Sequence, residues 1–283
     1  NLFYCILLLF FLKKTMKIFR ILILTLFLFP YQQFSQSLDG KKVIYVYGGM
    51  DGHWPKESVD FFVPLLEKEG AIVKVFNNFS VYEDEQLMKE ADLIIQVFTD
   101  AYSSDPRMND NQFEGLRNAI INGTGFAGWH GGLADSSPNP LYHFIVGGDF
   151  VSHPGELEGM KTAEYEIKIY DSLDYITNGV SNFKITNSEQ YYMMIDPNVK
   201  VLAVSKFKLN NWQPNENEIK GSFMPMIWKK NYGKGRVFYN SIGHYQREFE
   251  IPEALTIQMR GFRWASEGKY HPKENLISPV YKK

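Results

Sequence analysis

The first half of the chain alternates short apolar runs with segments of helical periodicity, and this alternation limits the folds open to it. The expected strands are Val43–Tyr47, Ala71–Phe76, Leu93–Phe98 and Thr124–Trp129. Between them, Val59–Leu66 and Asp110–Asn122 carry apolar residues on one helical face, and Asp84–Glu90 favours a helix. Strands that alternate with helices at this spacing form βαβ units. We therefore predict an α/β fold with a largely parallel sheet flanked by helices.

Beyond about residue 160 the pattern predicts antiparallel strands added to this sheet. The expected strands are Ala163–Tyr170, Val199–Ser205, Met224–Trp228 and Arg236–Asn240. The turn Tyr232–Gly235 joins the last two as a hairpin, and Pro252 begins a final helix that ends near Trp264. The polar residues 210–218 are expected to form a surface loop. No Pro/Ser-rich linker separates the halves, so we predict one domain over residues 37–283, with its core at about 41–268.

Residues 1–36 have a different character. They contain no acidic residue and two apolar runs, Leu2–Leu12 and Ile18–Phe29, each shorter than the roughly 20 residues that cross a bilayer. From Met16 a basic start, a short apolar run and a polar tail follow, as in a secretory signal peptide. We expect translation to start at Met16, with residues 1–15 an over-extension of the frame, and cleavage near Ser35–Ser37. The mature protein is then periplasmic or secreted, without a stable membrane span; an uncleaved anchor is the alternative.

Charge and cysteine content exclude several classes of function. The chain has 30 Lys and Arg against 32 Asp and Glu, and residues 1–36 carry four of the basic residues and no acidic one. The remaining balance of about −6 argues against a nucleic-acid partner, which requires a basic excess. The one cysteine, Cys5, lies in the expected signal peptide, which excludes a disulfide framework, a Cys-rich zinc site and a mature thiol nucleophile. A small molecule is the expected partner.

One glycine motif imitates a nucleotide site. Gly123–Gly128 has the letters G-x-G-x-x-G, but in a dinucleotide site these glycines follow a strand and begin a helix. Here a predicted helix precedes them and a predicted strand follows, so Gly123 is interpreted as a helix end. The chain also lacks a P-loop and a G-x-S-x-G nucleophile elbow. We expect no nucleotide cofactor.

The histidines give a more specific signal. Four of the six follow expected strand ends or glycine-rich turns: His53, His130, His153 and His244. Ligands of open α/β sheets bind outside the carboxyl ends of the strands, so these four are candidate functional residues. His143, in an expected helix, and His271, in the polar tail, are interpreted as structural. Glu189, which precedes two tyrosines, is the candidate carboxylate.

Imidazoles with one carboxylate support two chemistries, and the sequence leaves both open. General acid–base catalysis near neutral pH would use His130, His153, Glu189 and His244. A divalent, zinc-like metal held by His130, His153 and His244 is the other interpretation. The candidate substrate-binding residues are Asp51, His53, Trp129, Tyr191 and Trp228. Together with Tyr192, the aromatic members are expected to rim a polar cleft suited to a sugar.

Several segments occur in a specific order along nearly all of the mature chain: Gly123–His130, Tyr142–Pro154, Ser188–Tyr191, Met224–Trp228 and Gly233–His244. In this order they resemble the ThuA-like (trehalose-utilisation) family. The resemblance implies a flavodoxin-like sheet of the class I glutamine amidotransferase-like superfamily. His130 stands where true amidotransferases have their nucleophilic cysteine, so cysteine-dependent glutaminase chemistry is not expected. Two departures are Ser188, where an acid often precedes the glutamate, and Asp174–Gly179, where the family often has His-Pro-Ile.

The resemblance implies a role in carbohydrate metabolism, with a disaccharide or a keto-sugar as substrate. We expect an enzyme of hydrolase, lyase or isomerase type that acts through the histidines and Glu189. A two-carboxylate glycosidase is less favoured, because Glu189 is the only carboxylate nominated as catalytic. The alternatives are a sugar-binding or accessory module without turnover and a structural subunit. Homo-oligomerisation is left open.

Overall fold

The computed structural model describes residues 36–100, 107–153, 162–207, 219, 221–273 and 276. Residues 1–35 with Cys5, most of the expected signal peptide, and the loop expected at 210–218 lie outside this part of the chain. From Ser37 onward the described chain forms one compact unit. None of the helices described is both long and apolar enough to cross a bilayer.

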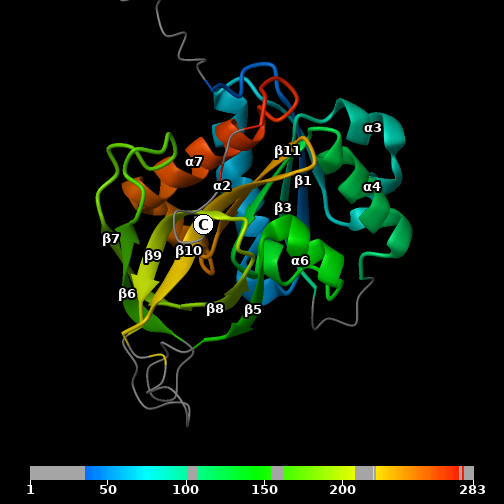
Figure 1. Cartoon of the computed structure of the whole chain (residues 1–283). Helices are drawn as coiled ribbons and strands as arrows, with labels where there is room; N and C mark the ends of the chain where they lie inside the picture. Colours follow the sequence, from blue (N-terminus) through cyan, green and yellow to red (C-terminus); the bar gives the residue numbers. More distant parts are fainter. Residues whose placement is uncertain are drawn as a thin grey trace, which may run out of the picture. The chain divides into compact units, whose positions relative to one another are not determined.

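The centre of the molecule is a nine-stranded sheet whose first part is parallel (Figure 1). The parallel strands are β1 (Lys42–Gly49), β2 (Ile72–Phe76), β3 (Leu93–Thr99), β4 (Gly125–Trp129) and β11 (Gly235–Asn240). They lie in the order β2-β1-β3-β4-β11, and each neighbouring pair is parallel. This is the doubly wound order of a flavodoxin-like sheet. The predicted fold class is confirmed.

The second half of the chain extends this sheet with antiparallel strands. These are β10 (Phe223–Tyr232), β9 (Lys200–Lys206), β6 (Ala163–Ile169) and β7 (Phe183–Ser188). The β10–β11 hairpin pairs Tyr232 with Gly235, as the turn sequence predicts. A separate two-stranded sheet joins β5 (Gly148–Ser152) and β8 (Tyr192–Ile195). The sequence pattern missed β5, β7 and β8. Strands β5 and β8 are short and lack a regular apolar alternation, and β7 alternates only over its first four residues.

Helices cover both faces of the sheet (Figure 1). On one face lie α2 (Pro55–Lys68) and α7 (Pro252–Ala265); on the other lie α3 (Glu85–Glu90), α4 (Asp110–Ile121), α5 (His130–Ala134) and α6 (Pro140–Val146). Alternate residues of β1 face the two cores: Val43 and Tyr45 pack toward α2 and α7, and Ile44 and Val46 toward α3–α6. Three short 3₁₀ helices complete the described structure: η1 (Asp51–His53), η2 (Phe79–Glu83) and η4 (Gln246–Glu250).

The glycine motif has the structural context that its surroundings predict. Asn109 and Gln112 form a capping box at the start of α4, and Asn122 is the C-cap at its end. Gly123 follows with a φ of 116°, a conformation that favours glycine. Gly125 then begins β4. The glycines thus lead from a helix into a strand, which is the opposite of the order in a dinucleotide site.

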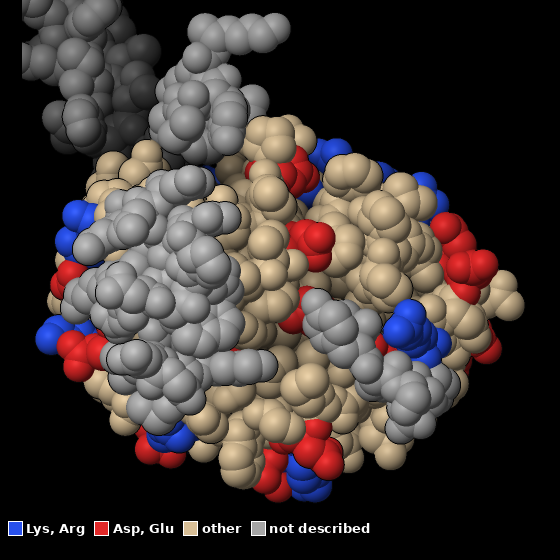
Figure 2. Space-filling view, turned by 90° about the horizontal axis from the view of Figure 1, so that it is seen from below, with Lys and Arg blue, Asp and Glu red and all other residues tan. Residues whose placement is uncertain are grey.

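Charge is dispersed on the face seen from below (Figure 2). The described Lys and Arg side chains on this face are scattered rather than gathered into one patch, and acidic residues lie among them. Side chains of both signs thus share this face.

Candidate functional site

The candidate histidines lie at one edge of the sheet. His53 is in η1 after β1, His130 follows β4, and His244 is in the loop after β11. Because these strands are parallel, their carboxyl ends share an edge. Strands β10, β9 and β6 lie between β11 and β7 in the sheet, and each neighbouring pair is antiparallel, so β7 runs in the same direction as β11. Glu189 follows the end of β7 and therefore also lies at this edge.

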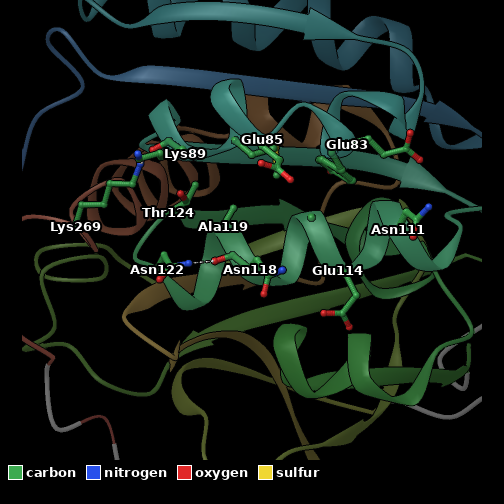
Figure 3. A pocket seen from close by; sticks show the side chains of 13 residues that line it. Glu83, Glu85, Lys89, Asn111, Glu114, Asn118, Ala119, Asn122, Thr124 and Lys269 are labelled. Atoms are coloured by element: carbon green, nitrogen blue, oxygen red, sulfur yellow. Dashed lines mark hydrogen bonds between the residues drawn. The ribbon is translucent and has the colours of Figure 1, made fainter.

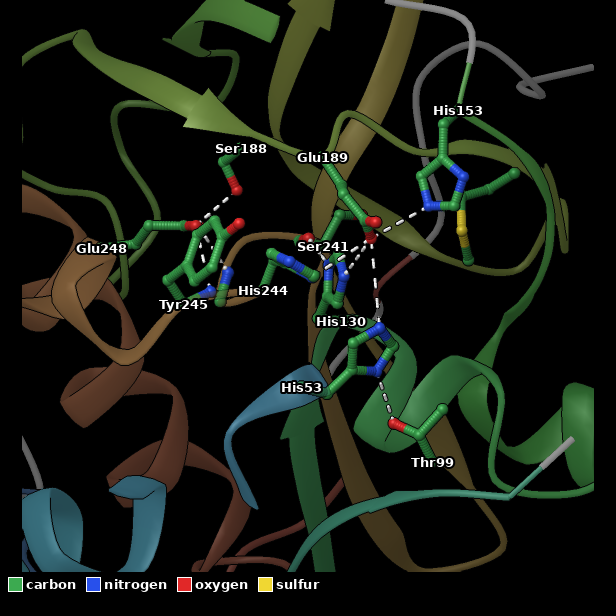
Figure 4. Close-up of polar contacts among 12 residues, drawn as sticks. His53, Thr99, His130, His153, Ser188, Glu189, Ser241, His244, Tyr245 and Glu248 are labelled. Carbon is green, nitrogen blue, oxygen red and sulfur yellow. Dashed lines mark hydrogen bonds and ion pairs between the residues drawn. The ribbon is translucent and has the colours of Figure 1, made fainter. Parts of the chain in front are cut away.

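Glu189 is the centre of the site (Figure 4). Its Oε2 lies 3.0 Å from His130 Nε2, 3.0 Å from His153 Nε2 and 3.2 Å from His244 Nδ1. His53 Nε2 lies 4.0 Å from the same oxygen. We call these five residues the Glu189 cluster. The structure thus brings all four candidate histidines and the candidate carboxylate together.

His130 is held at a sharp turn between β4 and α5. Its φ of 48° is unusual for a residue with a side chain, and such backbone strain often occurs at functional sites. Its Nδ1 lies 2.9 Å from the carbonyl oxygen of Ser241, and its ring packs against Tyr191 with centroids 4.0 Å apart. The imidazole is 1% exposed. This turn therefore presents Nε2 to Glu189 in one orientation.

His53 is oriented by the neighbouring strand β3. Its Nδ1 lies 2.7 Å from the hydroxyl of Thr99, and the backbone N–H of Met50 donates to the Thr99 carbonyl over 3.0 Å. Gly131 makes room for the ring, because a Cβ at that position would lie 2.6 Å from His53 Cε1. The sequence did not identify Thr99 as a residue of the site.

The loop that carries Glu189 is fixed by hydrogen bonds on both sides. The Tyr165 hydroxyl donates to the Glu189 carbonyl over 2.9 Å, and the Gln190 amide donates to Ser205 Oγ over 2.8 Å. The Arg247 guanidinium donates to the carbonyl of Asn187, whose φ is 50°. These contacts hold the backbone around the carboxylate without using the carboxylate itself.

Glu248 joins this loop to the one that carries His244. Its carboxylate accepts the backbone N–H of Gly243 at 2.8 Å, that of Tyr245 at 3.2 Å and the Ser188 hydroxyl. The residue is 3% exposed, and burial raises the pKa of its carboxyl. Nothing in its sequence context pointed to this role. Glu248 is a positioning residue. It connects the Ser188 hydroxyl, next to Glu189, with the backbone on both sides of His244.

We expect Glu248→Gln to lower the free energy of unfolding by about 1–3 kcal/mol, because an amide nitrogen then faces a buried donor. Urea unfolding followed by circular dichroism measures this change. Glu250→Gln is the matched control, since Glu250 is in the same 3₁₀ helix but exposed. Equal unfolding free energies for the two variants would show that Glu248 does not hold the loops.

The electrostatics of the cluster favour a charged carboxylate at Glu189 and neutral imidazoles at His53 and His130. Burial raises the pKa of Glu189, but its contacts with the imidazoles of His130, His153 and His244 outweigh this effect and hold the pKa well below its usual range. Burial, followed by repulsion from His130 and His244, lowers the pKa of His53 to about 3. Burial lowers the pKa of His130 to about 4 against the opposing effect of Glu189.

The expectation that Trp129, Tyr191 and Trp228 rim the site is wrong. Trp129 is 2% exposed and packs against Phe62 and Phe249 in the core beneath α2 and α7. Trp228 is fully buried, and its indole N–H donates to the carbonyl of Val146 over 2.9 Å. Tyr191 is 1% exposed and lies against His130. An aromatic residue near a candidate functional residue in the sequence can still have its ring buried in the core.

Two aromatic residues that the sequence analysis missed lie beside the cluster instead. Trp54 follows His53 and is 42% exposed, and half-buried Tyr245 follows His244. Their ring centroids lie 6.2 Å apart, and the Arg247 guanidinium lies 3.8 Å from the centre of the Tyr245 ring. Their positions directly after two candidate histidines were the available signal. Asp51 is exposed in η1, and Tyr192 is half-buried near Phe207.

The remaining histidines lie outside the cluster, each beside one carboxylate. His143 Nδ1 lies 3.4 Å from Asp149 Oδ1, and His271 Nε2 lies 3.2 Å from Glu267 Oε2. The structure therefore does not bring His143 and His271 to the candidate site. They also provide control positions for experiments on the cluster.

A separate hollow of about 870 Å³ lies between η2, α3 and α4 (Figure 3). Its polar lining includes Glu83, Glu85, Lys89, Glu114, Asn118 and Lys269. None of the lining residues belongs to the Glu189 cluster, and the acidic and basic groups are mixed. The hollow is therefore separate from the candidate site.

Comparison with known proteins supports the fold and identifies a family. A family model described as ThuA, trehalose utilisation, matches residues 42–265. Solved ThuA-like proteins from Bacteroides uniformis ATCC 8492 and Parabacteroides merdae ATCC 43184 are 19% and 18% identical, with TM-scores of 0.63 and 0.58. The first match covers 84% of this chain and 95% of the Bacteroides uniformis protein. The second covers 83% of this chain and 93% of the Parabacteroides merdae protein. A cytoplasmic protein from Salmonella typhimurium LT2 is 13% identical with a TM-score of 0.51, over 82% of this chain and 100% of that one. No curated protein sequence matches the chain.

Proposed function

The chain belongs to the ThuA family, described by trehalose utilisation, and from this premise we propose that it is an enzyme of carbohydrate metabolism whose reaction takes place at the Glu189 cluster. The observation that carries the proposal is the convergence of four imidazoles on one buried carboxylate oxygen. Polar groups of this kind at the carboxyl ends of parallel strands are typical of active sites in α/β proteins.

The residues of the cluster differ in their access to a substrate. His130 is buried, whereas the side chains of His153, His244 and His53 are 16%, 12% and 11% exposed. His130 and Glu189 therefore form the most buried part of the site, and the other imidazoles lie closer to an incoming substrate. An imidazole at this position suits proton abstraction next to the carbonyl of a keto-sugar, and so an elimination or an isomerisation.

A glycosidase reaction with two carboxylates fits the described residues less well. Glu189 is the single carboxylate of the cluster, and the carboxylate of Glu248 is buried and bound to three donors. Retaining and inverting glycosidases both need a second carboxylate across the scissile bond. The proposal is therefore a lyase or isomerase type of reaction.

We assign recognition of a sugar to the aromatic pair beside the cluster, exposed Trp54 and half-buried Tyr245. Sugar rings present C–H faces that pack on aromatic rings, while their hydroxyls bond to imidazole, carboxylate and guanidinium groups. Trp54 and Tyr245 supply the rings, and Arg247 and the cluster histidines supply the polar groups. Trp54 and Tyr245 thus replace Trp129 and Trp228 as substrate-binding candidates.

The test is turnover of disaccharides and their 3-keto derivatives by the purified protein. We expect the active substrate to be consumed by the wild type and not by His130→Ala, whereas His143→Ala, with a histidine outside the cluster, keeps wild-type turnover. Product analysis by NMR identifies the bond that changes. Sugar binding without turnover would instead favour an accessory module, and equal turnover by His130→Ala would place the reaction elsewhere.

Export remains part of the proposal, on the pattern of residues 1–36 alone. Fractionation of expressing cells and N-terminal sequencing of the recovered protein test it. A mature protein that begins near Ser35–Ser37 outside the cytoplasm is the expected result, and an intact N-terminus in the cytoplasm would contradict it.

A further inference from the structure

More imidazole nitrogens surround one oxygen of the Glu189 carboxylate, Oε2, than this oxygen can satisfy by hydrogen bonding. Three imidazole nitrogens lie within 3.2 Å of Glu189 Oε2, and His53 Nε2 lies 4.0 Å away. Each carboxylate oxygen offers about two lone-pair directions. His244 Nδ1 is buried and forms no hydrogen bond within the described structure, although Oε2 is 3.2 Å away. At least one nitrogen therefore faces the oxygen without a suitable bond.

The contacts of His130 make this conflict explicit. Its Nδ1 lies 2.9 Å from the carbonyl oxygen of Ser241, which accepts hydrogen bonds and cannot donate. A neutral His130 therefore carries its proton on Nδ1, and the lone pair on Nε2 points toward Glu189 Oε2 at 3.0 Å. Two lone pairs at this distance repel each other. A cation bound to both atoms turns that repulsion into attraction.

A proton shared between His130 Nε2 and Glu189 Oε2 would relieve this repulsion less well than a metal ion. It would place a positive charge on a ring that is 1% exposed, and it would serve only one of the three close nitrogens. A divalent ion at the centre of the cluster binds the lone pairs of several imidazoles and the carboxylate at once.

The spacing of the donor atoms also fits one ion. One donor atom from each of His53, His130, Glu189 and His244 lies within 4.8 Å of all the others. Four donors placed tetrahedrally at about 2.1 Å from zinc lie about 3.4 Å apart. The nitrogens of His130, His244 and His53 lie 3.0, 3.2 and 4.0 Å from Glu189 Oε2. His130 and His53 each have a hydrogen-bond partner on the ring nitrogen that faces away, Ser241 and Thr99 respectively. Such partners orient metal-binding histidines.

We propose that His53, His130, Glu189 and His244 bind one divalent metal ion. Imidazole-rich donor sets favour zinc and neighbouring first-row transition metals over magnesium or calcium. Compared with the three histidines nominated from the sequence, this set adds His53 and Glu189 and leaves out His153. When bound, such an ion supplies a Lewis acid for a carbonyl or hydroxyl oxygen. The inference rests on the proposed function for the role of the ion, whereas binding itself is independent of the substrate.

The experiment uses the full chain after treatment with a chelator. Titration with Co²⁺, followed by its visible absorption, and with Zn²⁺ by calorimetry should give one equivalent in the wild type. We expect His244→Ala to weaken binding by more than about 10-fold, and Thr99→Val, which removes only the partner of His53, to weaken it by roughly 10- to 100-fold. His143→Ala and His271→Ala are matched controls that should bind like the wild type.

Thr99→Val keeps the test valid if a ligand variant does not fold. A wild-type chain that takes up neither ion overturns the proposal, as does uptake that both His244→Ala and Thr99→Val leave unchanged. Metal binding without turnover of any sugar supports this inference and contradicts the proposed function. Sugar turnover by a wild-type chain that takes up neither ion supports the proposed function and overturns this inference.

Discussion

Glu189→Gln is expected to abolish turnover while leaving the fold intact. Glu189 Oε2 is the one atom that the cluster histidines share, and the substitution removes its charge and places an NH₂ group where one carboxylate oxygen was. Loss of a group that only supports a metal ligand lowers metal affinity or activity by roughly 10- to 100-fold. Loss of the central carboxylate should therefore lower turnover by more than about 100-fold. Steady-state kinetics on the substrate identified by screening measures the effect.

The matched control is Asp149→Asn. Asp149 also lies beside a histidine, with His143 at 3.4 Å, but it is exposed and outside the cluster. It should keep turnover near the wild-type value. Circular dichroism and the melting temperature confirm that both variants are folded. Wild-type turnover by a folded Glu189→Gln protein would remove the cluster from the reaction.

Trp129→Ala should lower the free energy of unfolding by about 3–5 kcal/mol, the usual cost of removing a large buried aromatic side chain. Trp129 packs among Phe62, Phe249 and Phe262, and it lies next to Gly243, where an added Cβ would be 2.3 Å from the indole. Urea unfolding measures the change. Trp129→Phe keeps an aromatic ring in the core and should lose much less stability.

Substrate affinity should respond to the exposed ring rather than to the buried one. An aromatic contact contributes about 0.5–1.5 kcal/mol, so Trp54→Ala should raise KM by about 2- to 10-fold. Trp129→Phe should leave KM unchanged. The opposite pattern, with KM sensitive to Trp129→Phe and not to Trp54→Ala, would restore Trp129 as a substrate-binding residue.

Much of the fold follows from local patterns in the sequence. Apolar runs such as Leu93–Phe98 and the helical periodicity of Asp110–Asn122 predict the parallel half of the sheet, because those patterns depend on neighbours within one element. The antiparallel hairpin at Tyr232–Gly235 is equally local. Strands β5, β7 and β8 were not predictable in this way, since pairing with distant strands, rather than their own pattern, holds them in place.

The sequence by itself determined the parallel sheet and the nomination of His53, His130, His153 and His244, because parallel strands end at a common edge. Only the tertiary structure decided that Glu189 lies at their centre. Its place depends on β7, whose direction is set by the three antiparallel strands between it and β11. Which aromatic rings reach the surface was also a tertiary outcome. The packing of α2 and α7 buries Trp129, while the turn after His53 leaves Trp54 exposed.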